Sequence, residues 1–189
     1  MRNPLVLAIA AAMSVGLAAL VPATASAAGS GDTNSTFTVN GNASGLSISV
    51  PDGSTTPVDL GSATAGAASL SHALGNVTVT DTRGALTATW TATGSSTNFT
   101  TGGASANETV AKANVGYWAG VGTAQVGQVG AFVPAGTIAT PVALGSASTV
   151  GNWAGVGNNT VSWNPTITFT LLPSQVAGTY SGTITHSVS

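Results

Sequence analysis

Apolar and hydroxyl-bearing residues alternate along much of this chain, in short segments separated by Gly, Pro and Asn. Successive side chains of a β-strand point to opposite faces, so a period of two indicates a strand with one dry and one wet face. Such strands are predicted at Thr36–Val39, Leu46–Val50, Val77–Thr80, Leu86–Thr93, Val110–Trp118, Pro141–Leu144, Thr166–Leu171 and Gly178–Val188. Many short strands with turn residues between them predict an all-β protein, a single antiparallel β-sandwich with Greek-key-like connections.

The same alternation predicts which residues face the core. In the segment 86–93 the inward residues are Leu86, Ala88, Trp90 and Ala92. In the segment 166–171 they are Ile167, Phe169 and Leu171, and in the last segment Tyr180, Gly182, Ile184, His186 and Val188. A hairpin turn is expected at Gly84–Ala85, between the segments 77–80 and 86–93.

No significant helix is predicted after the N-terminal hydrophobic segment. Ala63–Leu74 is rich enough in Ala and Ser to form one turn, but Gly66 and Gly75 disfavour a longer helix. One pentapeptide occurs twice, at Trp118–Gly122 and Trp153–Gly157. The two copies are interpreted as related loops at one end of the sandwich, in which each Trp either covers the core, the favoured reading, or is presented to a ligand.

The N-terminus has the features of a secretory signal. Arg2 is followed by the apolar run Leu5–Val21 and by the small residues Ala25–Ala27, so we expect cleavage after Ala27. A retained membrane anchor is the alternative, but the run is short for a bilayer and no charged stop-transfer flank follows it. Residues 28–35 then form a polar linker, and residues 36–189 form one domain.

Composition excludes several classes of protein. The absence of Cys excludes disulfides, thiolate metal sites, a Cys nucleophile and a lipid-anchoring thiol. Without Arg2, Arg83 and Lys112 stand against five carboxylates, a formal net charge of −3, which disfavours nucleic acids and anionic membranes as partners. Thr, Ser, Asn and Gly must therefore cover the surface. That coat suits neutral glycans, and it is also an ordinary surface for an exported β-protein.

The residues that usually carry catalysis are few. His72, His186 and the five carboxylates form no recognisable catalytic motif, so neither an enzyme nor a cofactor is predicted. Oxygen donors for calcium are present at Asp32, Asp52 and Asp59, but no EF-hand pattern accompanies them and no metal site is predicted. Asp81 and Arg83 share a strand face, so we expect them to pair as a structural ion pair.

Two segments resemble a known family. Val77–Gly84 ends in Asp-Thr-Arg-Gly and is followed by Trp90, as at the start of the WxL cell-surface domain. Tyr180–Val188 resembles the second motif of that family, and the likeness spans residues 76–188. The sequence departs from the motif at two positions, because the first Trp-x-Leu reads Trp90-Thr91-Ala92 and the second reads His186-Ser187-Val188.

The resemblance implies an exported surface protein. Family members attach non-covalently to peptidoglycan and can assemble with other envelope proteins, so peptidoglycan or another envelope glycan is the partner expected here. The candidate binding residues are Trp90, Trp118, Trp153, Tyr180 and His186. The alternative for Trp90 and the Tyr180–Val188 stripe is that they fill the core between the sheets.

A second class of function is a structural or assembly subunit of a surface layer, a pilus-like fibre or an extracellular matrix. Uncovered sheet edges with few charges favour the addition of strands from other surface proteins or from further copies. Ordered water or ice on the threonine arrays is a third and weaker possibility. Leu172–Gln175 only begins like a sortase site, so covalent sorting to the wall is not expected.

Overall fold

The computed structural model describes residues 34–53, 56–124 and 128–189. The predicted signal peptide and its cleavage site lie outside these residues. The chain divides into two units, Met1–Thr38 and Val39–Ser189. Residues 34–38 of the first unit contain no strand, and all strands described below belong to the second unit.

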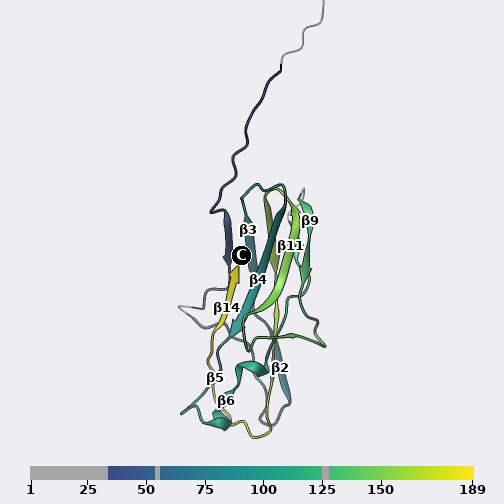
Figure 1. The fold of residues 1–189 in the computed structure, drawn as a ribbon. Helices are drawn as coiled ribbons and strands as arrows, with labels where there is room; N and C mark the ends of the chain where they lie inside the picture. The colour runs from purple at the N-terminus through teal and green to yellow at the C-terminus, as the bar shows by residue number, and fades with distance from the viewer. Residues whose placement is uncertain (1–33, 54–55, 125–127) are drawn as a thin grey trace, which may run out of the picture. The chain divides into compact units, whose positions relative to one another are not determined.

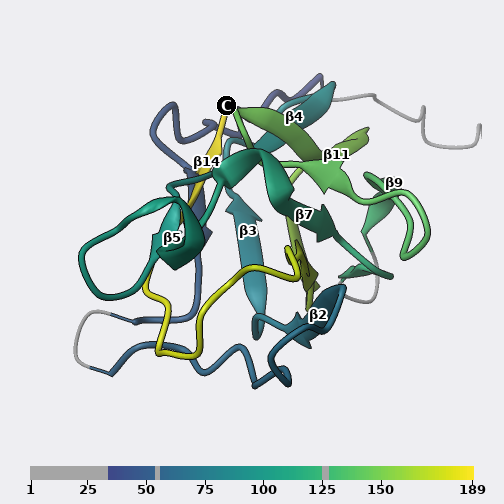
Figure 2. The ribbon, with the colours of Figure 1, turned by 90° about the horizontal axis from the view of Figure 1, so that it is seen from below.

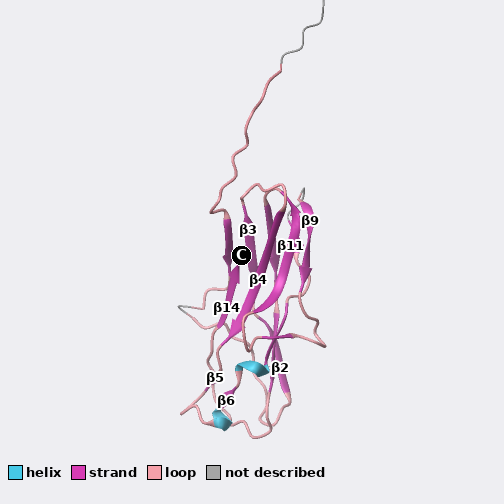
Figure 3. Ribbon diagram, viewed as in Figure 1, coloured by secondary structure: helices cyan, strands magenta, loops and turns pink. Residues whose placement is uncertain are grey.

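The described residues of the second unit are almost entirely β-structure (Figure 3). The strands are β1 (Leu46–Ser49), β2 (Ser69–Ala73), β3 (Val77–Asp81), β4 (Ala88–Ser96), β5 (Phe99–Thr100), β6 (Thr109–Val110), β7 (Val115–Trp118), β8 (Thr123–Ala124), β9 (Val129–Pro134), β10 (Val142–Ala143), β11 (Ser148–Val156), β12 (Asn159–Trp163), β13 (Thr166–Thr170) and β14 (Ile184–Val188). Two 3-10 helices, η1 (Ala106–Glu108) and η2 (Lys112–Asn114), are the only helical segments in the described part of the chain, and neither is long enough to cross a membrane.

Two antiparallel sheets join end to end into one bent layer. Their strand orders are β1-β3-β12-β8 and β10-β7-β13-β2. The strand β2 leads into β3, while their partners β13 and β12 are also consecutive. At the join, the Leu74 N–H donates to the Pro165 carbonyl (2.8 Å) and the Gly75 N–H to Asn164 Oδ1 (3.0 Å). Gly75 has a φ of +104°, which favours glycine at this bend.

A third sheet, in the order β14-β4-β11-β9, forms the opposite layer (Figures 1 and 2). Pairing continues past the end of β4, because Thr97 donates to the Thr183 carbonyl (2.9 Å). Farther along, Thr100 and Ser181 exchange both backbone hydrogen bonds. The segment 181–183 is therefore an extension of β14 alongside the chain that leads from β4 into β5.

Aromatic side chains fill the space between the layers. Trp90 of β4 stacks on Trp163 of β12 with ring centroids 6.3 Å apart, and Phe132 of β9 stacks on Trp163 at 5.0 Å. Toward β5 and β6 the core continues as Phe99 against Phe169, at 4.9 Å in an edge-to-face contact. These contacts between opposite sheets give the unit its sandwich-like arrangement.

The all-β class is confirmed, and so are several inward positions. Ala88, Trp90 and Ala92 are buried on β4, and Ile167 and Phe169 are buried on β13. Threonines alternate with them, as expected for strands that are dry on one face.

Other predictions are wrong at particular residues. Thr36–Val39 is not a strand, and Phe37 and Val39 are 90% and 79% exposed. Leu86 lies before β4 and is 85% exposed. Gly84–Ala85 does not close a hairpin, because β3 pairs with β1 and β12 whereas β4 pairs with β11 and β14. The connection instead crosses from one layer to the other.

The remaining corrections concern the extent of strands. The predicted Val110–Trp118 strand is interrupted by η2, and the Pro141–Leu144 strand is reduced to β10. The final strand begins only at Ile184, which leaves Tyr180 and Gly182 outside it. One turn does form within Ala63–Leu74, closed by the Ala67 N–H and the Thr64 carbonyl (2.9 Å), and the unpredicted strand β2 follows it. Trp153 lies inside β11 rather than in a loop, because β4 and β9 pair with β11 on both sides.

Candidate functional site

A buried carboxylate marks the point where the chain crosses between layers. The side chain of Asp81, the last residue of β3, is fully buried. Arg83 donates to it from Nε and Nη2, both at 2.9 Å, and from its backbone N–H at 3.0 Å. Arg83 Nη2 also donates to the Thr89 carbonyl (2.7 Å). The predicted pair of Asp81 and Arg83 is confirmed, and it holds the connection between β3 and β4.

The same carboxylate is linked to Trp90. Asn159 of β12 donates from Nδ2 to Asp81 Oδ2 (3.4 Å), and Trp90 Nε1 donates to Asn159 Oδ1 (2.7 Å). The hydrogen bonds from Arg83 hold the pKa of Asp81 below its ordinary value. We call these residues, Asp81, Arg83, Trp90 and Asn159, the carboxylate network. It joins β3, β12 and β4 across the sandwich.

A second polar bridge contains His186. Trp163 Nε1 donates to the Tyr117 hydroxyl (2.8 Å), which lies 3.2 Å from His186 Nε2. Burial raises the pKa of Tyr117 and lowers the pKa of His186 to about 4, so near neutrality the phenol is protonated and the imidazole is neutral. The Tyr117 hydroxyl and His186 Nε2 share one hydrogen bond. The other ring nitrogen, Nδ1, is buried and has no hydrogen-bond partner among the described residues.

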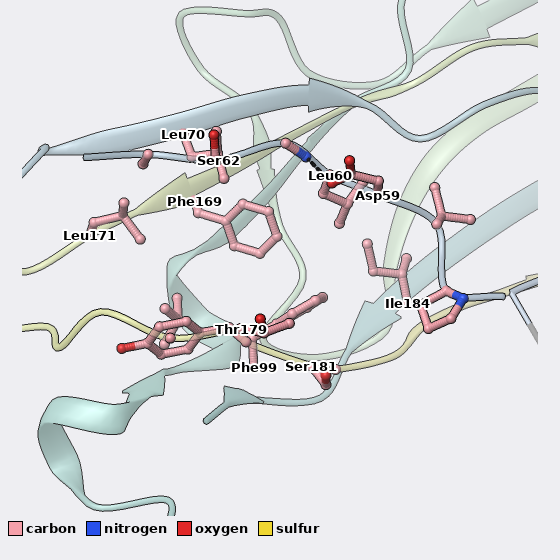
Figure 4. Close-up of a pocket in the computed structure, with 18 of the residues that line it drawn as sticks. Asp59, Leu60, Ser62, Leu70, Phe99, Phe169, Leu171, Thr179, Ser181 and Ile184 are labelled. Atoms are coloured by element: carbon pink, nitrogen blue, oxygen red, sulfur yellow. Dashed lines mark hydrogen bonds between the residues drawn. The ribbon is translucent and has the colours of Figure 1, made fainter. Parts of the chain in front are cut away.

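A cleft of about 1250 Å³ opens at the side of the sandwich (Figure 4). The segments 50–53 and 57–67 line it on one side and residues 175–184 on the other. Its apolar side chains come from both layers, and they include Leu60, Leu70, Phe99, Phe169, Leu171 and Ile184. Asp52 and Asp59 are exposed lining residues, and no Lys or Arg is among the lining residues.

The cleft exists because β1 is too short. This strand pairs with β3 and ends at Ser49, and Pro51 follows with no backbone N–H to donate. The strand β2 lies in line with β3, before it in the chain. Because β1 runs antiparallel beside β3, a longer β1 would continue beside β2. Among the described residues, β2 instead pairs only with β13, on one side. The place beside β2 that a longer β1 would occupy therefore has no strand in it.

The opposite wall is also a free strand edge. Thr91 and Ser189 exchange backbone hydrogen bonds, and the Thr183 carbonyl accepts from Thr97. Backbone groups of an antiparallel strand point alternately to its two sides. Because Thr183 and Ser189 bond toward β4, the backbone N–H and C=O groups of Gly182, Ile184 and His186 point away from β4, toward the open edge of the sheet. On the other wall, residues 56–63 make no backbone-to-backbone hydrogen bond with another described residue.

The cleft includes two of the five predicted binding residues. Tyr180 and His186 line it, and the Tyr180 hydroxyl donates to the Val176 carbonyl (2.8 Å). Trp90 and Trp153 are each only 2% exposed, within the core, so neither ring has an open face for a ligand. Trp118 is partly buried at the end of β7 and is not part of the cleft lining.

Most residues that line the cleft could not be predicted from the sequence. Val58, Leu60 and Phe99 belong to no predicted strand, and the alternation of residues does not place them together. One signal was present, since Pro51 and Pro57 follow the segment 46–50 closely and prevent that strand from continuing. In the described residues no group of three or more His, Asp or Glu could hold a metal, and Asp32 lies outside these residues.

Comparison with family models, with curated proteins and with solved structures gives no match for this chain. Its function must therefore be argued from the cleft and the two polar bridges.

Proposed function

We propose that this chain is a non-enzymatic, exported surface protein whose cleft accepts an extended polypeptide strand. The observation that carries the proposal is the pair of free edges at the cleft, on β2 and on the Gly182–His186 run. A peptide that enters such a gap gains main-chain hydrogen bonds from an edge and specificity from pockets for alternate side chains. Protein would thus be joined to protein at a bacterial surface.

The chemistry of the lining supports strand binding more than catalysis. The floor holds Phe99, Phe169 and Leu70, which suit the apolar face of a strand. The ionisable lining residues are Asp52, Asp59, Tyr180 and His186. His186 Nε2 already shares a hydrogen bond with the Tyr117 hydroxyl, so this nitrogen is not free to act as a base on a ligand.

The proposal is tested with a fluorescent peptide of eight residues that alternates Thr and Val, added to the chain from Ala28 onward. We expect binding by anisotropy, and slower hydrogen exchange at the amides of Gly182 and Ile184. Ser62→Arg with Thr179→Arg places two cations on exposed cleft residues and should abolish binding. Asn152→Arg, on the exposed face of β11, is the matched control. A peptide that leaves both amides unprotected would refute the cleft as a strand site.

Attachment to peptidoglycan is the second candidate function, and one observation favours it. Asp81, Arg83 and Trp90, which carry the resemblance to the WxL domain, belong to one hydrogen-bonded network although β3 and β4 lie in different sheets. The chain from Ala28 onward should sediment with purified, protein-free sacculi at moderate salt. Retention in the supernatant would count against wall attachment and would leave the cleft proposal intact.

A further inference from the structure

The chain carries an exposed segment with the pattern of a strand. All of residues 34–40 are exposed, including Phe37 at 90% and Val39 at 79%. These two apolar residues alternate with Thr36 and Thr38, so in extended form Phe37 and Val39 share one face. We call residues 34–40 the arm. Its apolar face has no partner in the described residues.

The chemistry of the arm matches that of the cleft. An extended arm would place Phe37 and Val39 on the apolar floor and direct its threonines toward solvent. The arm has no charged residue that the apolar floor would have to desolvate. The arm therefore has the single apolar face that a strand bound on the apolar floor of the cleft needs.

Phe37 and Val39 cannot both reach the cleft of their own chain while residues 41–46 keep their places. Gly41 lies so close to the Arg83 carbonyl that a side chain there would collide with it. Leu46 pairs with Asp81, two residues before Arg83, so this end of β1 lies near Gly41. From Leu46 the chain extends about 13 Å to Val50, where the cleft begins. Val39 precedes Gly41 by two residues and can reach only about 7 Å from it. A cleft that receives both Phe37 and Val39 therefore belongs to another molecule.

We infer that the arm of one copy enters the cleft of a second copy as an added β-strand, in the place beside β2 that a longer β1 would occupy. This rests on the proposed function and names the strand that the cleft accepts. Each copy then has one arm and one cleft on different parts of the chain. Such a head-to-tail contact builds open chains of subunits unless the rotation between copies closes a ring.

The first test is the molar mass of the chain from Ala28 onward, measured by size-exclusion chromatography with light scattering over a range of concentrations. We expect oligomers that grow with concentration. Phe37→Asp with Val39→Asp should leave a monomer, because two carboxylates cannot enter the apolar floor. Thr36→Asp with Thr38→Asp adds the same charge to the other face of the arm and should preserve the oligomers. Equal masses for the two double variants would overturn the proposal.

The second test uses the absence of cysteine from the chain. A copy with Phe37→Cys is mixed with a copy that carries Ser62→Cys or Thr179→Cys, which lie in opposite stretches of the cleft lining. Mild oxidation should give a mixed disulfide dimer with at least one of the two. Asn152→Cys, on the outer face of β11, is the control and should give at least tenfold less. Equal yield from the control would refute insertion into the cleft.

The two proposals can fail separately. If Ser62→Arg with Thr179→Arg removes the oligomers but Phe37→Asp with Val39→Asp does not, the cleft binds a strand and the arm is not that strand. If the cleft variant also leaves the oligomers unchanged, the arm does not enter the cleft, and the peptide experiment decides separately whether the cleft binds a strand. Circular dichroism establishes that each variant is folded. The four substituted residues are exposed, so we expect folding to persist: Phe37, Val39, Ser62 and Thr179.

Discussion

At the scale of residues, the molecule depends on a few polar side chains buried among many apolar ones. Asp81 and Asn159 are 1% and 3% exposed, and each has hydrogen-bond partners. A buried charge without such partners would be costly, since burial removes it from water. The carboxylate network therefore fixes the β3–β4 crossing, and His186 with Tyr117 joins the layers near the cleft.

Replacing Arg83 by Ala should destabilise the fold. The variant would leave the buried Asp81 carboxylate with only the backbone N–H of residue 83 and the amide of Asn159. We expect a loss of about 2 to 3 kcal/mol in the free energy of unfolding, measured in urea, because hydrogen bonds to a charged group are lost. Lys112→Ala, at an exposed residue, is the control. An unchanged midpoint would refute the structural role of Arg83.

His186 should make stability fall as the pH drops from 6.5 to 4. Its pKa is about 4 in the fold and near 6.5 when unfolded, so in this window the unfolded chain binds a proton that the folded chain does not. The difference corresponds to about 3 kcal/mol at the acid end. His186→Gln does not titrate and should flatten the curve of unfolding free energy against pH. Asp81 affects both proteins equally, because its stabilising effect is lost only at lower pH. Parallel curves would contradict this account.

At the scale of elements, strands are shaped by how their neighbours pack. The second copy of the pentapeptide lies in β11, where the Trp153 indole covers Gly155 and, on β9, Gly130. Glycine at both positions leaves room for a ring that lies flat against the sheet. The first copy, Trp118–Gly122, starts at the end of β7 and continues beyond it. Identical sequences thus have different surroundings.

Gly155→Ala should weaken the pairing of β9 with β11. A methyl group there would collide with the Val129 carbonyl and approach Trp153 Nε1 to 2.7 Å. Overpacking of this kind costs about 1 to 3 kcal/mol, and a thermal melt should register it as a lower Tm. Gly103→Ala meets only one atom within 4 Å, at 3.7 Å, and serves as the control. If the two variants melt at the same temperature, the packing argument fails.

At the scale of the whole folded unit, the layers are continuous from one end of the sandwich to the other. The bent layer passes through Leu74–Gly75, and the opposite layer continues from β4 into β5. The packed aromatic groups at the two ends, Trp90 with Trp163 and Phe99 with Phe169, therefore depend on the same long ribbons. Residues 39–189 should behave as one cooperative unit.

Unfolding of this unit should be a single transition. Tryptophan fluorescence reports on Trp90, Trp153 and Trp163, and circular dichroism reports on all the strands. We expect both signals to give the same midpoint and the same slope in urea, as in two-state unfolding. The Phe37→Asp with Val39→Asp chain should be used, so that self-association does not distort the curves. Separate midpoints would mean that the two ends unfold independently.

The sequence by itself determined the class of fold and several core positions, because the period-two alternation is a local property of each strand. It also predicted the Asp81–Arg83 pair, whose members are two residues apart. The tertiary structure decided which strands pair, that β3 and β4 lie in different layers, and that Trp153 lies inside a paired strand rather than in a loop. It alone produced the cleft. That gap arises where β1 ends beside strands distant in the chain, and no local pattern encodes the absence of a neighbour.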